Sequence, residues 1–123
     1  TRLFTAIDHT KIPVGHIVLR NINPKGRYAR ITGVLVDSAK RGMVLGPQMV
    51  NAVLSIGFEE IGLHRIDLGV FDVNARAIRC YEKCGFVREG LAREEFLAPD
   101  GSYWNMLSMA ILDREWKAKR TGQ

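Results

Sequence analysis

The sequence predicts an α+β domain whose mixed, mostly antiparallel sheet contains one parallel crossover near its centre. Short stretches of alternating polar and apolar residues recur between turn residues, which is typical of strands. An amphipathic helix separates two of these stretches, and a strand, a helix and a strand in that order favour a parallel pair. Because 123 residues leave room for one core, a single domain over residues 1–123 is expected.

The first three strands are expected to form an antiparallel meander. Residues 3–7 are mainly apolar, and residues 14–22 alternate well enough for a second strand. Residues 23–26, Asn-Pro-Lys-Gly, are a turn signal that leads into a third strand at 28–36. The continuous apolar run at 34–36 indicates that this third strand lies at the buried centre of the sheet.

A helix at 47–61 and a strand at 65–71 are expected to complete the crossover. The apolar residues of the helix recur at spacings of three and four, which places them on one face. Pro47 suits the first turn of the helix, and Gly62 is placed to end it in the left-handed conformation.

A second helix, residues 75–84, is expected to begin at the capping residue Asn74 and to end at Gly85. The two cysteines of the chain, Cys80 and Cys84, lie four residues apart and therefore share one face of this helix. A disulfide between adjacent turns would be strained and would close a trivial loop. Free thiols that pack in the core are expected, in a reducing compartment. No metal site is expected, because the three histidines are scattered.

The last part of the chain predicts a hairpin and a short helix. Two strands, 86–97 and 102–112, flank the turn Pro99-Asp100-Gly101, and residues 113–119 are expected to be helical.

Composition and charge exclude several classes of protein. With 46% hydrophobic and 25% charged residues, the chain has the composition of a globular protein. No apolar run approaches the roughly 20 residues that cross a bilayer, and no secretory signal opens the chain, so a soluble, cytoplasmic protein without a membrane partner is expected. Residues 1–46 hold eight basic and two acidic side chains of a chain whose net charge is +5. A solvated basic face, a small anionic ligand and nucleic acid are all open interpretations, nucleic acid being the least favoured because aromatic residues do not interleave with the cations.

The segment 41–46 is the most informative candidate site. It joins a predicted buried strand to a helix N-terminus, where free N–H groups and the helix dipole favour anions. Gly42 and Gly46 permit close approach of a ligand, and Lys40 and Arg41 add positive charge. The spacing alone is consistent with two interpretations: the segment binds a phosphate, or its glycines serve only to form the turn between strand and helix.

Several motifs in the same order resemble the GNAT superfamily of acetyl-coenzyme A (acetyl-CoA) dependent N-acetyltransferases. The superfamily loop Q/R-x-x-G-x-G/A is matched by residues 41–46, Arg-Gly-Met-Val-Leu-Gly. The signature N-x-x-S/A-x-x-x-Y-E-K-x-G-F is matched by residues 74–86, and the tail from Glu89 to Trp116 is similar to the branch that acetylates ribosomal-protein N-termini.

This resemblance implies a GNAT fold, acetyl-CoA as co-substrate and a role for each matched segment. The strands 28–36 and 65–71 would splay apart around the pantetheine arm, and segment 41–46 would hold the pyrophosphate. Tyr81 would donate a proton to the leaving thiolate, for which an ordinary phenol pKa near 10 is suitable. The implied cofactor-binding residues are Val34, Leu35, Val36, Arg41, Gly42, Met43, Val44, Leu45, Gly46, Asn74, Ala77 and Arg79.

The chain departs from the superfamily at two positions and in its extent. Val44 replaces the first loop glycine, and Gly69 stands where one subgroup has a glutamate base. The base is therefore unassigned, with Asp37, Glu94, Glu95 and bulk water as the alternatives. The expected fold also lacks the first strand and two helices of the superfamily, and a homodimer would cover the side that they leave exposed.

Three functions follow from these patterns. The leading hypothesis is acetyl transfer from acetyl-CoA to a primary amine, either a protein N-terminus or a small amine, by direct attack. A non-catalytic acyl-CoA-binding module is the first alternative, and nucleic-acid binding through the basic N-terminal third is the second.

Overall fold

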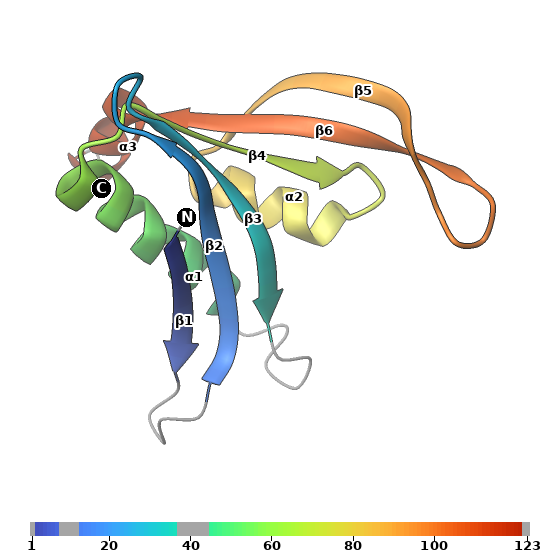
Figure 1. Cartoon of the computed structure of the whole chain (residues 1–123), viewed down its shortest axis with the longest axis horizontal. Helices are drawn as coiled ribbons and strands as arrows, with labels where there is room; N and C mark the ends of the chain where they lie inside the picture. The colour runs from blue at the N-terminus through green and yellow to red at the C-terminus, as the bar shows by residue number, and fades with distance from the viewer. Residues whose placement is uncertain (1, 8–12, 37–44, 122–123) are drawn as a thin grey trace.

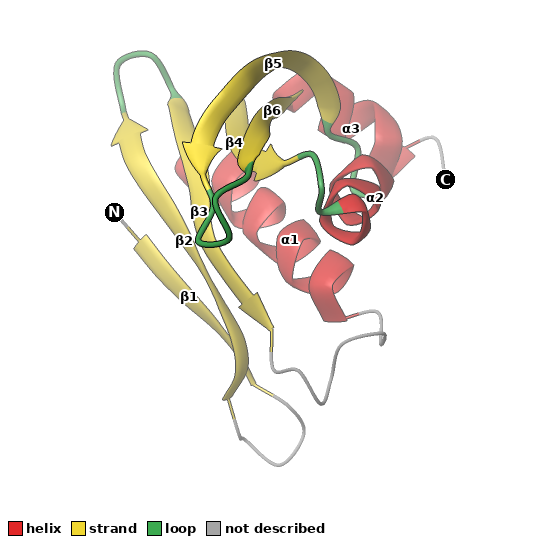
Figure 2. Ribbon diagram, turned by 90° about the vertical axis from the view of Figure 1, so that its right-hand side faces the viewer, coloured by secondary structure: helices red, strands yellow, loops and turns green. Residues whose placement is uncertain are grey.

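The structure is a computed structural model that describes residues 2–7, 13–36 and 45–121. In this part of the chain, six strands form one sheet in the order β1-β2-β3-β4-β6-β5, and the helices pack on one of its faces (Figure 1, Figure 2). Neighbouring strands are antiparallel except β3 and β4, which are parallel, so the expected α+β class and central crossover are confirmed. The strands are β1 (Arg2–Ile7), β2 (Pro13–Asn23), β3 (Tyr28–Val36), β4 (Arg65–Phe71), β5 (Val87–Leu97) and β6 (Tyr103–Leu112).

The helices begin and end close to the expected residues, with one difference. They are α1 (Leu45–Ser55), η2 (Ile56–Ile61), α2 (Ala75–Lys83) and α3 (Asp113–Thr121). The helix predicted over 47–61 is present, but from Ile56 the chain widens from an α-helix into a π-helix, which the sequence pattern did not indicate. Gly57 lies at this change and approaches β4 closely: a Cβ on Gly57 would lie 2.8 Å from Cδ1 of Ile66. Gly62 ends the segment with φ of 81°, as expected for a left-handed cap.

The core lies between the helices and one face of the sheet. On β4 the residues Ile66, Leu68 and Val70 are buried against the helices, while the residues between them face the other side. Helix α3 closes one end, since Trp116 is buried with its ring 5.5 Å from that of Phe58. The two faces of β2, β3 and β4 therefore differ: one is packed under helices, and we call the other the open face.

The hairpin of β5 and β6 extends past α2, as Figure 1 shows. Strand β5 forms one edge of the sheet and is exposed along its whole length. An aromatic cluster of Phe71, Phe96 and Trp104 ties the hairpin to the end of β4, with ring centroids 4.9–5.8 Å apart. No helix among the described residues combines the length and the apolar character needed to cross a membrane.

Candidate active site

The strands β3 and β4 pair only over their first four residues and then separate. The parallel register joins Tyr28 to Arg65 and ends at Ile31 and Leu68. Beyond this point β3 stays paired with β2 on its other edge, up to Val36, and β4 stays paired with β6. Figure 1 shows the two strands diverging. Over residues 32–36 and 69–71, no strand of the described chain pairs with the two edges that face the gap, so their backbone groups are available to a ligand.

Helix α1 begins beside this gap, and the sulfur atoms of α2 pack against its first turn. A Cβ on Gly46 would lie 3.6 Å from Sγ of Cys80, and the Cys84 thiol donates to the carbonyl of Pro47 at 3.7 Å. The first turn of α1 contains no acidic side chain, so nothing in that turn offsets the positive end of the helix dipole. The predicted loop residues Arg41, Gly42, Met43 and Val44 lie outside the described residues.

Both cysteines are free thiols with unequal environments. Cys84 is fully buried, whereas Cys80 is half-buried. The interaction between the two neighbouring thiols lowers the pKa of Cys80 and, together with burial, raises the pKa of Cys84. The expectation of free thiols is thus confirmed, and core packing holds fully for Cys84 and partly for Cys80.

Asn74 caps α2 as expected. Its Oδ1 accepts the backbone N–H of Ala77 at 3.2 Å, which satisfies one of the free donors at the start of the helix. No hydrogen bond joins the Nδ2 group of this exposed side chain to another described residue. The amide can therefore cap the helix through its oxygen and still donate to a ligand through its nitrogen.

Tyr81 lies on the buried face of α2 and packs edge-on against Phe86, with ring centroids 5.8 Å apart. Burial, followed by the charges that Cys80 and Cys84 would carry, raises the pKa of Tyr81 to about 12. The phenol therefore differs from the ordinary one expected from the sequence: it stays protonated well above neutral pH.

The remaining predicted cofactor-binding residues lie in two different parts of the structure. The backbone of Val34, Leu35 and Val36 runs along the β3 edge that faces the gap. Arg79, in contrast, lines a groove of about 500 Å³ between α2 and the hairpin, together with Arg88 and Leu91. Its predicted contact with the adenosine end of the cofactor stays a prediction.

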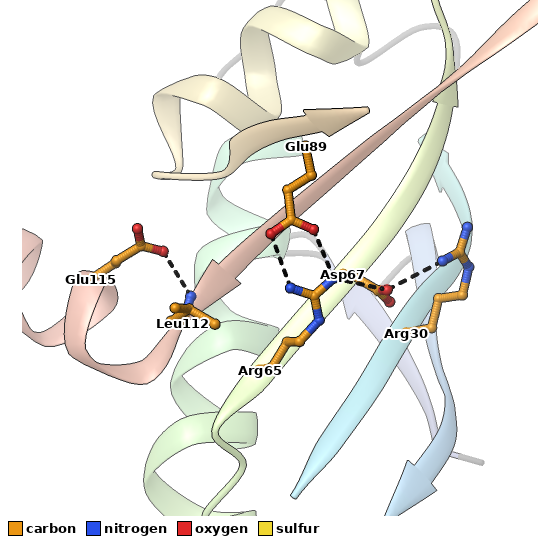
Figure 3. Close-up of polar contacts among 6 residues, drawn as sticks. All are labelled: Arg30, Arg65, Asp67, Glu89, Leu112 and Glu115. Carbon is orange, nitrogen blue, oxygen red and sulfur yellow. Dashed lines mark hydrogen bonds and ion pairs between the residues drawn. The ribbon is translucent and has the colours of Figure 1, made fainter. Parts of the chain in front are cut away.

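An ion-pair network crosses the open face beside the gap, and Figure 3 shows its side chains. Arg65 binds Glu89 through two hydrogen bonds of 2.8 and 3.0 Å, which raises the pKa of Arg65 and lowers that of Glu89. Asp67 lies 3.5 Å from Arg65 and 3.4 Å from Arg30. The sequence pattern did not single out Arg30, although its place on a strand parallel to that of Asp67 is the signal that could have done so.

Of the candidate bases, the structure describes Glu94 and Glu95. Asp37 lies outside the described residues, and Glu94 and Glu95 lie on the exposed strand β5. The backbone N–H of Glu94, at φ of 52°, donates to Oδ1 of Asn105 on β6. Among the residues described, no group of three or more His, Cys, Asp or Glu side chains could hold a metal ion.

Comparisons with known proteins agree with this geometry. Spermidine N(1)-acetyltransferase of Vibrio cholerae serotype O1 is 32% identical over 94% of this chain, and aminoglycoside N(6')-acetyltransferase type 1 of Klebsiella pneumoniae is 35% identical over 58%. A crystal structure of spermidine N-acetyltransferase from Vibrio cholerae in complex with CoA and spermine superposes on 94% of this chain with a TM-score of 0.88 and 32% identity.

The chain spans 65% of the length of the Vibrio spermidine enzyme, 33% of the Klebsiella enzyme and 68% of the crystallised chain. The finer prediction of a ribosomal-protein branch finds no support in these names, which give spermidine and an aminoglycoside. The superfamily prediction stands, because the model of the acetyltransferase (GNAT) family matches residues 1–86. That match, the splayed parallel strands and the sheet order together show that the chain belongs to the GNAT acetyltransferase family.

Proposed function

We propose that this protein transfers an acetyl group from acetyl-CoA to a primary amine. The observation that carries the proposal is the separation of β3 and β4 after Ile31 and Leu68, at a site flanked by the start of α1 and by the buried face of α2. The names of the two relatives given above, a spermidine N(1)-acetyltransferase and an aminoglycoside N(6')-acetyltransferase, support the same reaction.

The residues beside the gap fit a cofactor with a peptide-like arm and a pyrophosphate. The unpaired β3 edge at Val34, Leu35 and Val36 offers backbone donors and acceptors that suit the amides of pantetheine. Leu45 and Gly46 open α1, whose positive dipole end suits a phosphate, with Arg41 to Val44 preceding them in the chain. Asn74 has an Nδ2 donor to spare, and Ala77 follows it one helical turn later.

The chemistry requires little more than positioning and two proton movements. Attack by the neutral amine on the thioester carbonyl forms the C–N bond and breaks the C–S bond, while backbone N–H groups of the splayed edge stabilise the charge on the carbonyl oxygen. The amine nitrogen loses its proton to water, and the thiolate gains one from Tyr81, which water then reprotonates. Tyr81 stays protonated because its pKa is about 12, so it acts as a hydrogen-bond donor toward the sulfur over the whole physiological pH range.

The test of Tyr81 is the acetylation of a panel of amines by wild-type protein and by Tyr81→Phe. The variant should lower kcat by about 10- to 100-fold while leaving the Kd for acetyl-CoA, measured by calorimetry, nearly unchanged. Tyr103→Phe is the matched control, because Tyr103 is exposed and lies at the tip of the hairpin. Equal turnover by the wild type and Tyr81→Phe would remove Tyr81 from the mechanism, and binding of acetyl-CoA without turnover on any amine would favour a non-catalytic module.

The two roles of Asn74 can be separated with two substitutions. Asn74→Asp keeps an oxygen that caps α2 but removes the Nδ2 donor, whereas Asn74→Ala removes both. We expect Asn74→Asp to keep the stability of the wild type and to raise the KM for acetyl-CoA, and Asn74→Ala to lose about 1 kcal/mol of stability as well. A wild-type KM in Asn74→Asp would restrict Asn74 to capping.

A further inference from the structure

The open face carries two arginines directly opposite each other on neighbouring strands. Arg20 of β2 and Arg30 of β3 are register partners, on the side of these strands that faces away from the buried Leu19 and Ile31. Arg20 is exposed and donates through Nε to Oγ1 of Thr32 at 3.1 Å. Like charges at directly opposed positions of an antiparallel pair are destabilising, so this arrangement is unfavourable unless an anion joins it.

The carboxylates on this face do not neutralise the pair. Glu89 is committed to Arg65 through its two short hydrogen bonds. Asp67 is shared between Arg65 and Arg30 at 3.5 and 3.4 Å, and it has no ion pair with Arg20 among the described residues. Three guanidinium groups thus face two carboxylates, and the excess positive charge lies on the β2–β3 side, where Arg30 keeps 40% of its side chain exposed.

The guanidinium of Arg30 lies at the point where β3 and β4 separate. A Cβ on Gly69 would lie 2.8 Å from Nη2 of Arg30, so the arginine extends over β4 one residue beyond the last paired position, Leu68. The same Cβ would lie 2.9 Å from Sδ of Met106, so any larger residue at position 69 would require the ends of the Arg30 and Met106 side chains to shift. Arg30 therefore places a cation at the open-face side of the gap in which the proposed function locates acetyl transfer.

We propose that Arg30, assisted by Arg20, binds a carboxylate of the acceptor, so that the preferred substrates are amines with a nearby anionic group, such as amino acids or peptides with an acidic side chain. The inference rests on the proposed function. A planar guanidinium with free N–H groups binds a carboxylate with two hydrogen bonds. The same two cations repel a polyamine, whose charges are all positive.

Three variants and one control test this assignment. Arg30→Gln removes the positive charge. Arg30→Lys keeps the charge but lacks the planar guanidinium that binds a carboxylate with two hydrogen bonds. Gly69→Ala keeps the arginine but displaces its side chain from β4. Arg114→Gln is the control, since it removes the same charge from an exposed position on α3. Circular dichroism and thermal melting confirm that each variant is folded.

The substrates are matched dipeptide amides with glutamate or glutamine as the second residue, and spermidine as the cationic acceptor. For the wild type we expect kcat/KM to favour the glutamate peptide over its glutamine partner. Arg30→Gln should lower kcat/KM for the glutamate peptide about 10- to 100-fold and leave the glutamine peptide nearly unchanged. Arg30→Lys and Gly69→Ala should fall between, Arg114→Gln should match the wild type, and the KM for acetyl-CoA should be the same in all.

A second measurement keeps this inference separate from the proposed function. Calorimetry of the N-acetylated dipeptides in the presence of CoA should give the wild type the same preference for glutamate, and that preference should disappear in Arg30→Gln. If binding shows the preference while no amine is turned over, the proposed function fails and the anion site stands. Turnover without a preference for glutamate, a preference for spermidine, or an effect of Arg30→Gln confined to the KM for acetyl-CoA would each overturn the assignment of Arg30 to the acceptor. Absence of both turnover and binding preference would overturn both.

Discussion

The ionisation of Tyr81 links the packing of α2 to pH and can be measured directly. Burial, followed by the two cysteines on the same helix, raises its pKa from 10 to about 12. One pKa unit corresponds to about 1.36 kcal/mol, so the neutral phenol contributes roughly 2–3 kcal/mol to the free energy of unfolding. Because the pKa is higher in the folded state than in the unfolded state, this contribution is complete below pH 10 and is lost as the pH rises from 10 to about 12.

The assay is a difference titration between the wild type and Tyr81→Phe. The ultraviolet absorbance of tyrosinate in the wild type, minus that in the variant, isolates one of the three tyrosines of the chain. We expect a midpoint near pH 12, and a free energy of unfolding, from urea titrations, that falls by roughly 2–3 kcal/mol more in the wild type than in Tyr81→Phe between pH 10 and 12.

Far-ultraviolet circular dichroism at each pH shows whether the chain is still folded. A difference midpoint near pH 10 in folded protein would refute the reasoning, because it would mean that the phenol is solvated. Tyr103→Phe is again the control, since it removes an exposed phenol and should leave the urea midpoints at pH 10 and 12 as far apart as in the wild type.

Two further predictions concern packing and thiol reactivity. Gly57→Ala should lower the free energy of unfolding by about 1–3 kcal/mol in urea titrations, because the new Cβ would lie 2.8 Å from Cδ1 of the fully buried Ile66. Gly90→Ala is the control, because a Cβ added at Gly90 would have no heavy atom within 4 Å. Equal urea midpoints for the two variants would contradict the close approach of the helix to β4. A thiol reagent should modify one cysteine of the native protein and two after unfolding. The reason is that Cys80 is half-buried with a lowered pKa, whereas Cys84 is fully buried. Equal rates of modification of the two thiols in the native protein would contradict this difference.

Most of the fold could be predicted because its signals are local. Glycine at 62 and asparagine at 74 are end signals whose reasons lie in the backbone itself, and both residues occupy the predicted positions. The strand at 65–71 was recognisable because its alternate residues are apolar, and the same residues are those buried under the helices. Secondary structure alone sets the period at which apolar residues recur, two in a strand and 3.6 in a helix, so this pattern can be recognised before the fold is known.

What the sequence could not provide depends on contacts between distant segments. The π-helix at Ile56–Ile61 comes with the approach of Gly57 to Ile66, a contact across the crossover. The raised pKa of Tyr81 comes mainly from burial, which no spacing rule measures. The environment of Gly69 is likewise tertiary: the sequence shows only a missing side chain, and the structure shows the Arg30 guanidinium in the space this leaves.

Two basic residues in the first third of the chain, Arg20 and Arg30, lie together in a way that the sequence could not predict. Taken as one patch, the eight basic side chains of residues 1–46 suit a phosphorylated cofactor. Arg20 and Arg30, however, lie opposite each other on the open face of β2 and β3, whereas the predicted pyrophosphate residues Arg41 to Val44 follow β3 in the chain and lie outside the described residues. Since a strand rises about 3.3 Å per residue, the six residues from Arg30 to Val36 place Arg30 about 20 Å along β3 from the last residue of that strand. We therefore expect removal of Arg30 to change the choice of acceptor and to leave the KM for acetyl-CoA unchanged.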